Sequence, residues 1–573
     1  MARVVRLIGV LLAVAVLVVS IVGAAGDSPV TKAAKSGDVA AMRKLITSKV
    51  DVNERSGDGS TPLLWATHNS DIEMVKVLIA AGAKADVANN YGVTPLLDAS
   101  RTGDAAMIEV LLKAGADPKR THTEGETPLM AASRSGNVAA VRLLLDRGVD
   151  VNATDAFQKQ TALMWAAAEG HTDVVDALLN AGADPNRKAH VTSLTERKNA
   201  DHPTGGFTAL MWAARNGHED TAKRLVQGKA DMTLKNGDGA TATMVAIYND
   251  RFDMAKVLLD IGADPNDGSL YVAVEMRDST TDQFAFDGSR LRPNHPNKLT
   301  SLDLIDILLT RGADPYKTFS GQFHSTSMPN SDRFDNSPFF RSAVASDAEA
   351  LKVFIKHKID VDKTPIAPVA AAAAEGAAPA APPAGGRGAR GNPNAGRTAT
   401  MVTMTGGRGP QMTGGPGYIR SGTVPYREPG SRKPEDAFAV LVEGGANPNA
   451  KAPDGNSLLH MAAQANNLEM IKALAKAGVK FDQTNNNGLT ALDVVEGRQP
   501  AGGAPARGSR AGAPPPAPGG RGRGARGGAT PQDVAKLLRE LMGLPPAPPS
   551  AVPATAPAAV PAVPTPDEEG DQQ

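Results

Sequence analysis

The chain has 573 residues, with 61 Lys and Arg balanced by 61 Asp and Glu, 58 Gly, 42 Pro and no Cys. The absence of cysteine excludes disulfides, Cys-ligated zinc, iron–sulfur clusters and thiol catalysis. The zero net charge gives the protein no overall attraction to nucleic acid or to anionic membranes, and aromatic residues at only 4% mean that any core is built from Ala, Val, Leu and Ile.

The N-terminus has the layout of an export signal. Arg3 and Arg6 precede an apolar run from Leu7 to Val22, and small residues follow at 23–26. This layout predicts a signal peptide over residues 1–26, cleaved as the protein reaches the periplasm or the extracellular space. The alternative is an uncleaved inner-membrane anchor formed by residues 7–22, although this run falls just short of the roughly 17–25 residues that span a bilayer.

From residue 28 onward one phrase recurs with a period of 33 residues. Thr61-Pro62-Leu63 returns at 94 and 127, and variants of it begin at 161, 208 and 241. Thr suits a helix N-cap, Pro suits the first helical position, and the Gly residues that follow can end helices. Each unit is therefore predicted to hold two antiparallel helices and an extended finger, with Asp-Gly at the tip in cases such as 58–59. Such units must stack to bury their apolar faces.

These features resemble the ankyrin repeat family. The resemblance rests on the period, the Thr-Pro-Leu phrase, the Gly-His turns at 170–171 and 217–218, and Gly-Ala-Asp-Pro-Asn at 182–186 and 262–266. It implies an all-α fold with short β-hairpin fingers, a solenoid of stacked helix-turn-helix units, and a protein-binding function. The His that follows Leu in this family occurs here only as His460.

The register predicts twelve repeats, which start near residues 28, 61, 94, 127, 161, 208, 241, 268, 337, 367, 457 and 490. Residues 28–267 hold regular repeats one to seven. Residues 268–376 hold degenerate repeats eight and nine and the first helix of the tenth, from Pro368 to Gly376. Residues 434–497 hold parts of repeats ten to twelve, and 530–543 hold the last repeat helix.

Two inserts and the tail are expected to be disordered, because their Gly, Arg, Pro and Ala residues cannot bury enough apolar area. The inserts are residues 377–433 and 498–529, and the tail is the Pro/Ala-rich, acidic-ended segment 544–573. The first insert carries seven Arg and one Lys against one Glu, and the second carries six Arg and no acidic residue. The repeat body is consequently acidic. Candidate residues for binding an anionic surface are Arg387, Arg390, Arg521, Arg523 and Arg526.

All three tryptophans, Trp65, Trp165 and Trp212, lie four residues after the Thr of their unit. They either fill space between repeats or anchor a protein partner, because Trp serves both purposes. No motif for a catalytic, cofactor or metal site accompanies them, so we expect neither catalytic residues nor a cofactor nor a metal.

Two functional hypotheses remain open. The first is an exported, non-enzymatic scaffold that presents a groove and finger surface to a protein partner. The second is a cationic tether, whose Gly/Arg inserts bind an anionic cell-envelope polymer or nucleic acid, with the solenoid as a spacer. An envelope polymer is favoured over nucleic acid, because an exported protein is in the wrong compartment for RNA. Binding through the inserts should fall steeply with ionic strength.

Overall fold

The computed structural model describes residues 27–192, 204–277, 297–318, 337–364, 397–404, 430–498 and 529–546. The chain divides into two compact units, residues 1–447 and 448–573. The expected signal peptide, most of both Gly/Arg inserts and most of the tail lie outside the described residues, so the expectations for them stay predictions. Within the described ranges, no helix is long and apolar enough to cross a membrane.

Helices follow one another in pairs that consist of a first and a second helix. In the first unit the pairs are α2 (Pro29–Ser36) with α3 (Val39–Thr47), α4 (Pro62–His68) with α5 (Ile72–Ala80), α6 (Pro95–Thr102) with α7 (Ala105–Lys113), α8 (Pro128–Ser135) with α9 (Val138–Leu145), α10 (Ala162–Glu169) with α11 (Thr172–Asn180), α12 (Ala209–Asn216) with α13 (Glu219–Gln227), α14 (Ala242–Tyr248) with α15 (Phe252–Asp260), α16 (Ser269–Met276) with α17 (Ser301–Thr310), α18 (Pro338–Val344) with α19 (Ala348–Lys356), and α20 (Ala399–Met404) with α21 (Pro434–Glu443). In the second unit they are α22 (Leu458–Gln464) with α23 (Leu468–Lys476) and α24 (Ala491–Val495) with α25 (Pro531–Leu541).

The recurring phrase forms the start of each regular first helix. Thr94 is the N-cap of α6, its side chain accepts a hydrogen bond from the backbone N–H of Leu97, and Pro95 occupies the first helical position. Gly103 then ends the helix in the left-handed conformation, with φ of 70°. An Asp caps several second helices in the same way, as Asp104 does for α7. The local sequence therefore sets both ends of each helix.

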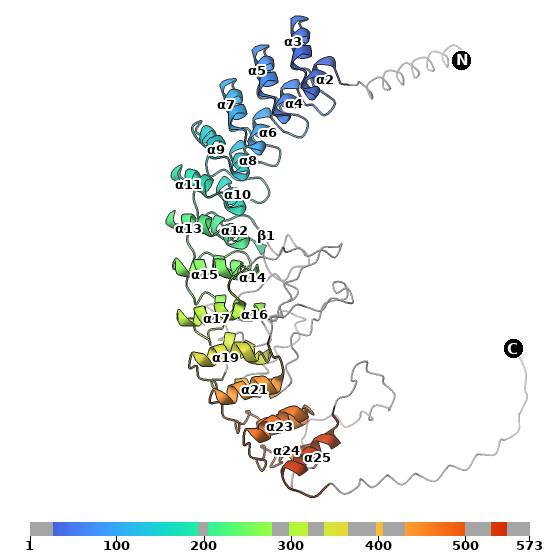
Figure 1. Ribbon diagram of the computed structural model, residues 1–573, viewed down its shortest axis with the longest axis vertical. Coiled ribbons are helices and arrows are strands. Elements are labelled where there is room, and N and C mark those ends of the chain that lie inside the picture. Colours follow the sequence, from blue (N-terminus) through green and yellow to red (C-terminus); the bar gives the residue numbers. More distant parts are fainter. Residues whose placement is uncertain are drawn as a thin grey trace, which may run out of the picture. The chain divides into compact units, whose positions relative to one another are not determined.

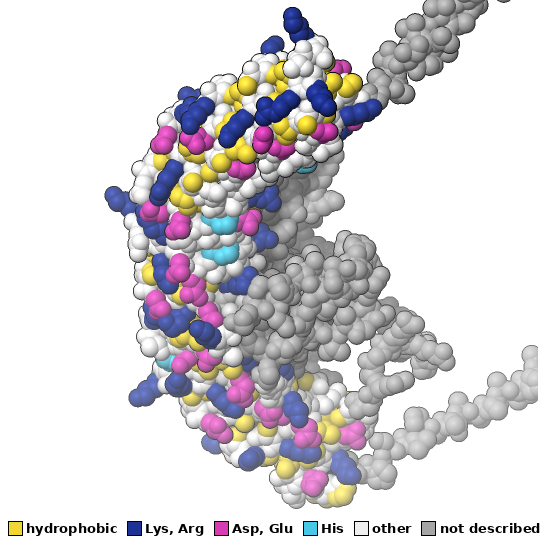
Figure 2. Space-filling view, turned by 45° about the horizontal axis from the view of Figure 1, so that its top comes forward, with side chains coloured by type: hydrophobic (Ala, Val, Ile, Leu, Met, Phe, Trp, Pro, Cys, Tyr) yellow, Lys and Arg dark blue, Asp and Glu magenta, His cyan; other side chains and the backbone are white. Residues whose placement is uncertain are grey.

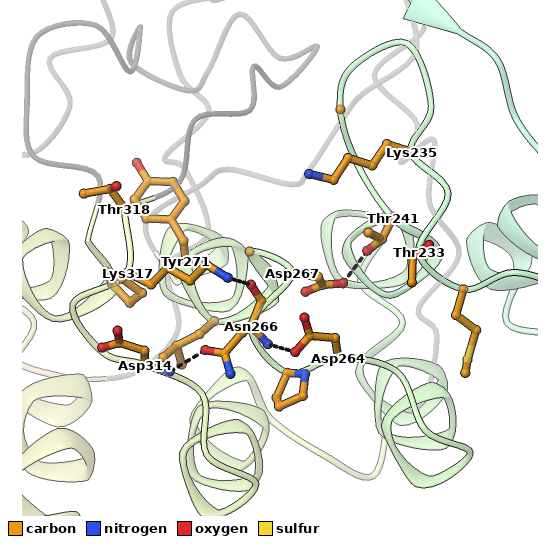
Figure 3. Close-up of a pocket in the computed structure, with 16 residues that line it drawn as sticks. Thr233, Lys235, Thr241, Asp264, Asn266, Asp267, Tyr271, Asp314, Lys317 and Thr318 are labelled. Carbon is orange, nitrogen blue, oxygen red and sulfur yellow. Dashed lines mark hydrogen bonds between the residues drawn. The ribbon is translucent and has the colours of Figure 1, made fainter. Parts of the chain in front are cut away.

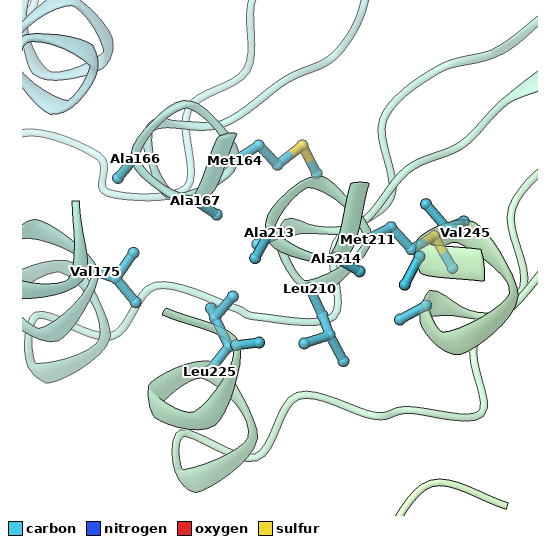
Figure 4. Close-up of a cluster of buried hydrophobic side chains, with 14 of the residues drawn as sticks. Met164, Ala166, Ala167, Val175, Leu210, Met211, Ala213, Ala214, Leu225 and Val245 are labelled. Carbon is cyan, nitrogen blue, oxygen red and sulfur yellow. The ribbon is translucent and has the colours of Figure 1, made fainter. Parts of the chain in front are cut away.

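The helices of the first unit form two layers (Figure 1). Each first helix packs on the first helix of the next pair, from α2 to α20, and each second helix packs on the next second helix, from α3 to α21. The core lies between these layers. Figure 4 shows how small residues on α10 and α12, such as Ala166 and Ala213, let Val175 and Leu225 of the second helices approach closely. This architecture confirms the expected all-α solenoid.

The connections after the second helices form the fingers. Several of them contain a tight turn, such as that closed by the Gly59 N–H donating to the Ser56 carbonyl at 2.8 Å. The fifth finger contains a two-stranded hairpin, β1 (Val191–Thr192) antiparallel to β2 (Thr204–Gly205). Several pairs of neighbouring fingers are joined by a backbone hydrogen bond, as described with the cavity below.

Histidines join neighbouring pairs on the opposite edge. Nε2 of His171 lies 3.0 Å from the Arg134 carbonyl, and Nε2 of His218 lies 3.0 Å from the Ala168 carbonyl. In the second unit His460 lies instead at the finger edge, in the first turn of α22, where it is buried and bridges the Ser457 hydroxyl, at 2.7 Å, to the Leu489 carbonyl, at 2.8 Å. Because carbonyls only accept, Nε2 of each ring carries the proton.

The tenth pair differs from the sequence prediction. Its first helix is α20, which lies inside the segment 377–433 that was expected to be wholly disordered, whereas the expected helix at 368–376 lies outside the described residues. α20 packs on α18 and α21, and Ala399 and Met404 are fully buried. The prediction favoured an alanine-rich match near 370. It missed Thr398-Ala399-Thr400-Met401-Val402, which repeats the sequence of 241–245 that opens α14.

Candidate functional site

The three tryptophans lie on the first-helix layer of the first unit, each partly exposed and packed against the core. Trp65 is on α4, Trp165 on α10 and Trp212 on α12. Their equivalent positions in the repeat set them along one line of first helices. The rings therefore fill inter-repeat space, as one of the two interpretations expected, and the role as anchors for a partner stays a prediction.

A cationic side chain covers each tryptophan ring. Lys35 Nζ lies 4.4 Å from the ring centroid of Trp65, and the guanidinium carbons of Arg134 and Arg215 lie 4.9 Å and 5.3 Å from those of Trp165 and Trp212. We call these six residues the tryptophan row. Each contact is within the distance of a favourable cation–π interaction.

The polar atoms of the tryptophan row are unevenly satisfied. Trp65 Nε1 donates to the Ser56 hydroxyl at 3.5 Å. Trp212 Nε1 is buried and has no acceptor in the described part of the chain. Its ring packs on Phe207, with ring centroids 5.1 Å apart. A buried N–H without an acceptor costs free energy.

Acidic side chains accompany the cations. Glu169 lies 3.7 Å from Arg134, and Asp27 lies 2.6 Å from Lys35. Asp98 lies 3.4 Å from His68, and burial raises the pKa of its carboxyl against the opposing effect of His68 and Arg101. Figure 2 shows the same mixture, with Lys and Arg side chains interleaved with Asp and Glu along the face in view. The surface does not select a partner by one dominant charge.

The fingers carry two exposed aromatic residues that the sequence analysis missed. Tyr91 and Phe157 are each 66% exposed, and both occupy the tip of their finger, next to turns at 89–92 and 155–160. Two periods of 33 residues separate them in the sequence. That spacing is the signal that could have identified them.

A cavity of about 400 Å³ lies among the fingers near α14 and α16. One side comes from residues 232–241, the floor from residues 264–271, and the other side from residues 314–318 (Figure 3). Its polar groups include the carboxylates of Asp264, Asp267 and Asp314 and the amines of Lys235 and Lys317. Sequence reasoning did not anticipate this cavity.

The other predicted site residues are not placed together. Arg387, Arg390, Arg521, Arg523 and Arg526 lie outside the described residues, so their role as anionic-surface contacts stays a prediction. Over the ranges that the structure describes, no group of three or more His, Cys, Asp or Glu is arranged to hold a metal ion.

A buried ionic cluster lies between the eighth and tenth helix pairs. Arg341 donates to Glu275 through Nε at 2.6 Å and Nη2 at 2.8 Å, and the Tyr271 hydroxyl donates to the same carboxylate at 3.0 Å. Arg277 and Arg432 both contact Asp347. Each of these charged groups pairs with an opposite charge inside the cluster, which indicates a structural role.

Comparison with known proteins identifies the repeat. The family described as "Ankyrin repeats (3 copies)" matches residues 30–122, 114–189, 190–269 and 431–495, together more than half of the chain. All of α16 except its first residue, and all of α17, α18, α19, α20 and α25, lie outside these ranges. The assignment of all twelve helix pairs as repeats of this family therefore stays a prediction.

Individual relatives cover short stretches. Protein fem-1 homolog C from Xenopus laevis is 38% identical over 63 residues, which is 11% of this chain and 10% of that protein. The Homo sapiens homolog is 39% identical over 61 residues, with the same shares. The chain thus matches about a tenth of the length of these relatives. Among solved structures, the human ASB11 ankyrin repeat domain is similar, with 26% identity, a TM-score of 0.35 and coverage of 41% of this chain and 97% of that one.

Proposed function

Because this chain belongs to the ankyrin repeat family, whose members are protein-interaction scaffolds, we propose that it is a non-enzymatic scaffold that binds a protein partner on its first-helix and finger side. The observation that carries the proposal is the pair of aromatic fingertips. Tyr91 and Phe157 are each 66% exposed in a chain with only 4% aromatic residues. Large aromatic side chains that project from a rigid scaffold are typical of residues that dominate binding energy.

The tryptophan row extends this surface toward the first helices. Trp65 and Trp165 are partly exposed, and Lys35 and Arg134 lie over their rings. A partner that covers these rings would remove water from the cation–π pairs, which strengthens such pairs. Both the apolar contact with the rings and the strengthened cation–π pairs would therefore contribute to the binding free energy.

Substitution of the fingertips tests this function. The full-length mature chain, used as bait in an extract of the cell envelope, should retain a specific protein, and the Tyr91→Ser/Phe157→Ser variant should lose it. The matched control is Leu541→Ser, which removes another exposed apolar side chain, in the second unit. Equal retention by the double variant and the wild type would remove the fingertips from the binding surface.

Export is part of the proposal and rests on the N-terminal sequence. Arg3, Arg6 and the apolar run of residues 7–22 support a cleaved signal that delivers the chain to the periplasm or the medium. N-terminal sequencing of the protein from its native cell should find a start between about Ala25 and Asp27. Retention of Met1 or Ala2 in a membrane fraction would instead support an inner-membrane anchor.

The tether is the second candidate, favoured by the charge of the inserts. Residues 498–529 hold six Arg and no acidic residue, so they would attract an anionic envelope polymer. Binding of this kind should weaken steeply between low and high salt, whereas binding through the aromatic fingertips should change little. A salt titration of the retained material therefore separates the two candidates.

A further inference from the structure

The cavity near α14 and α16 lies where the repeat pattern lacks a finger. Pro95 follows Gly82 by thirteen positions, and Pro128 follows Gly115 by the same number. Ser269, the first residue of α16, follows Gly262 by only seven. The six missing residues are those that form the finger elsewhere in the regular repeats.

The shortened connection still makes the normal contacts at its base. Asn266 Nδ2 donates to the Gly312 carbonyl at 3.1 Å, and its Oδ1 accepts from the Asp314 N–H at 2.8 Å. Asn152 makes the same two contacts with Gly182 and Asp184 between earlier pairs. α14 also packs on α16, and α15 on α17. The stack is therefore continuous, and the gap is confined to the fingers.

Several fingers contact a neighbour through a backbone hydrogen bond. The N–H of Asn90 donates to the Asp58 carbonyl at 3.0 Å, and the N–H of Ala156 donates to the Glu124 carbonyl at 2.8 Å. The finger that forms one wall of the cavity, residues 236–240, is itself a tight turn, and its Gly237 N–H donates to the Gly205 carbonyl at 2.8 Å. A turn of the same kind would fit beside it.

The side chains that line the cavity favour a ligand with a cationic group. Among described residues, Asp264, Asp267 and Asp314 form no ion pair with Lys or Arg, although Lys235 and Lys317 line the same cavity. Lys317 points its Nζ at the Asn266 carbonyl, 2.7 Å away (Figure 3). Asp267 accepts from the Thr241 hydroxyl at 2.5 Å and from the Ser269 N–H at 2.8 Å, and burial raises the pKa of its carboxyl.

We propose that this cavity is a docking slot for a β-turn of a partner protein that carries Arg or Lys at its tip, and that the turn takes the place of the missing finger. Its volume of about 400 Å³ lies within the range of about 300–1,000 Å³ that ligand pockets occupy. The partner's turn would pack against the turn at residues 236–240. Its Arg or Lys would be attracted by the carboxylates of the cavity. This slot is separate from the fingertips of Tyr91 and Phe157, so either site can fail without the other.

A cyclised peptide tests the slot with the full-length mature chain. The peptide copies residues 83–94, a regular finger of this protein, with Tyr91→Arg at its tip; the control peptide carries Tyr91→Glu. In a fluorescence anisotropy titration the Arg peptide should bind saturably, and the Glu peptide at least about ten-fold more weakly. Absence of saturable binding, or equal binding of the two peptides, would overturn the proposal.

Two protein variants keep the test specific. Insertion of residues 87–94 in place of residues 267–268 restores a finger and keeps Asn266, so it should abolish peptide binding while the helical circular dichroism is retained. Asp267→Asn can keep the hydrogen bonds to Thr241 and Ser269 but removes the charge, so it should weaken the Arg peptide several-fold and leave the Glu peptide unchanged. Unaltered binding by either folded variant would refute the slot. A third variant lacks residues 319–336. If it binds the peptide much more tightly than the wild type, the chain's own insert occupies the slot, and the proposal of a partner's turn is wrong.

Discussion

Arg277 and Asp347, 70 positions apart in the chain, form a two-point ion pair in the interior of the first unit. Nε and Nη2 of Arg277 lie 2.5 Å and 3.0 Å from the two carboxylate oxygens of Asp347. The side chains are 0% and 2% exposed. Arg277 follows α16 directly, and Asp347 is the N-cap of α19, so the pair ties the eighth helix pair to the ninth.

Removal of Asp347 should strongly destabilise the first unit. Asp347→Ala breaks a buried ion pair with Arg277, a change that typically costs about 3–5 kcal/mol. It also removes the cap that accepts from the Ala350 N–H at 3.1 Å. Urea unfolding followed by circular dichroism measures the loss. Asp260→Ala, which breaks exposed pairs with Lys256 and Arg311, should cost at most about 1 kcal/mol. Similar losses in the two variants would contradict this expectation.

The regular repeats should unfold after the interrupted ones. All three tryptophans lie on α4, α10 and α12, so tryptophan fluorescence reports only the N-terminal half of the first unit. In a one-dimensional stack an uninterrupted block opens last. The denaturant midpoint from fluorescence should therefore exceed that from far-ultraviolet circular dichroism. Coincident midpoints would show that the chain unfolds as one cooperative unit.

A core truncation in that block should have a large effect. Leu144 on α9 is fully buried, so Leu144→Ala should lower the free energy of unfolding by about 2–5 kcal/mol. Leu143→Ala is the matched control, because Leu143 is the adjacent residue and its side chain is only partly buried. Fluorescence-detected unfolding measures both variants, and a larger loss for the control would mean that the core assignment is wrong.

Asp98 should make stability depend on pH. Because burial raises the pKa of its carboxyl in the folded chain above the ordinary value of 3.8, the folded state binds the proton more tightly than the unfolded state. Stability therefore falls as pH rises from the unfolded pKa through the folded pKa. Asp98→Asn removes the titrating carboxyl. The stability of the variant relative to the wild type should therefore increase as pH rises through that window. Urea midpoints at pH 3.5 and pH 7 measure the gain; a difference independent of pH would exclude the carboxyl as its cause.

Shortening of the first Gly/Arg insert should depend on where the cut falls. Replacement of residues 405–429 by a short Gly/Ser turn should preserve thermal stability, because α20 and α21 remain to pack on each other and loop closure entropy changes only slowly with length. Replacement of all of 377–433 removes α20, with its buried Ala399 and Met404, and should lower the melting temperature. Equal melting temperatures would show that α20 contributes nothing.

The regular part of the fold could be predicted from sequence because its determinants are local. Thr94 caps a helix, Pro95 starts it and Gly103 ends it, and these three roles need only neighbouring residues. The tenth pair was misplaced because Pro368 to Gly376 matched the alanine pattern of a first helix. The five residues 398–402, identical to 241–245, were the better signal.

The site could be predicted only in part. The period located Trp65, Trp165 and Trp212, but the cations that cover them come from positions that sequence spacing alone does not pair. Arg432 was assigned to a disordered insert, yet it is 13% exposed and contacts Asp347 at 2.7 Å. Asp347 occupies the regular N-cap position of a second helix, but Arg432 lies where the repeat pattern is interrupted, so spacing alone does not pair the two residues.

The histidine turns limit the order in which these repeats can recombine. A Cβ on Gly136 would lie 2.5 Å from the His171 ring, and a Cβ on Gly170 would lie 2.5 Å from the His218 ring. Excision of residues 161–207 would bring Gly136 against His218, a compatible junction. If repeat two were placed directly before repeat six, Ser70 would lie against His218. Ser70 has the same left-handed conformation as the glycines, with φ of 55°, but its Cβ would clash with the His218 ring. The repeats are thus not interchangeable modules, since each glycine turn is matched to the side chain that follows it.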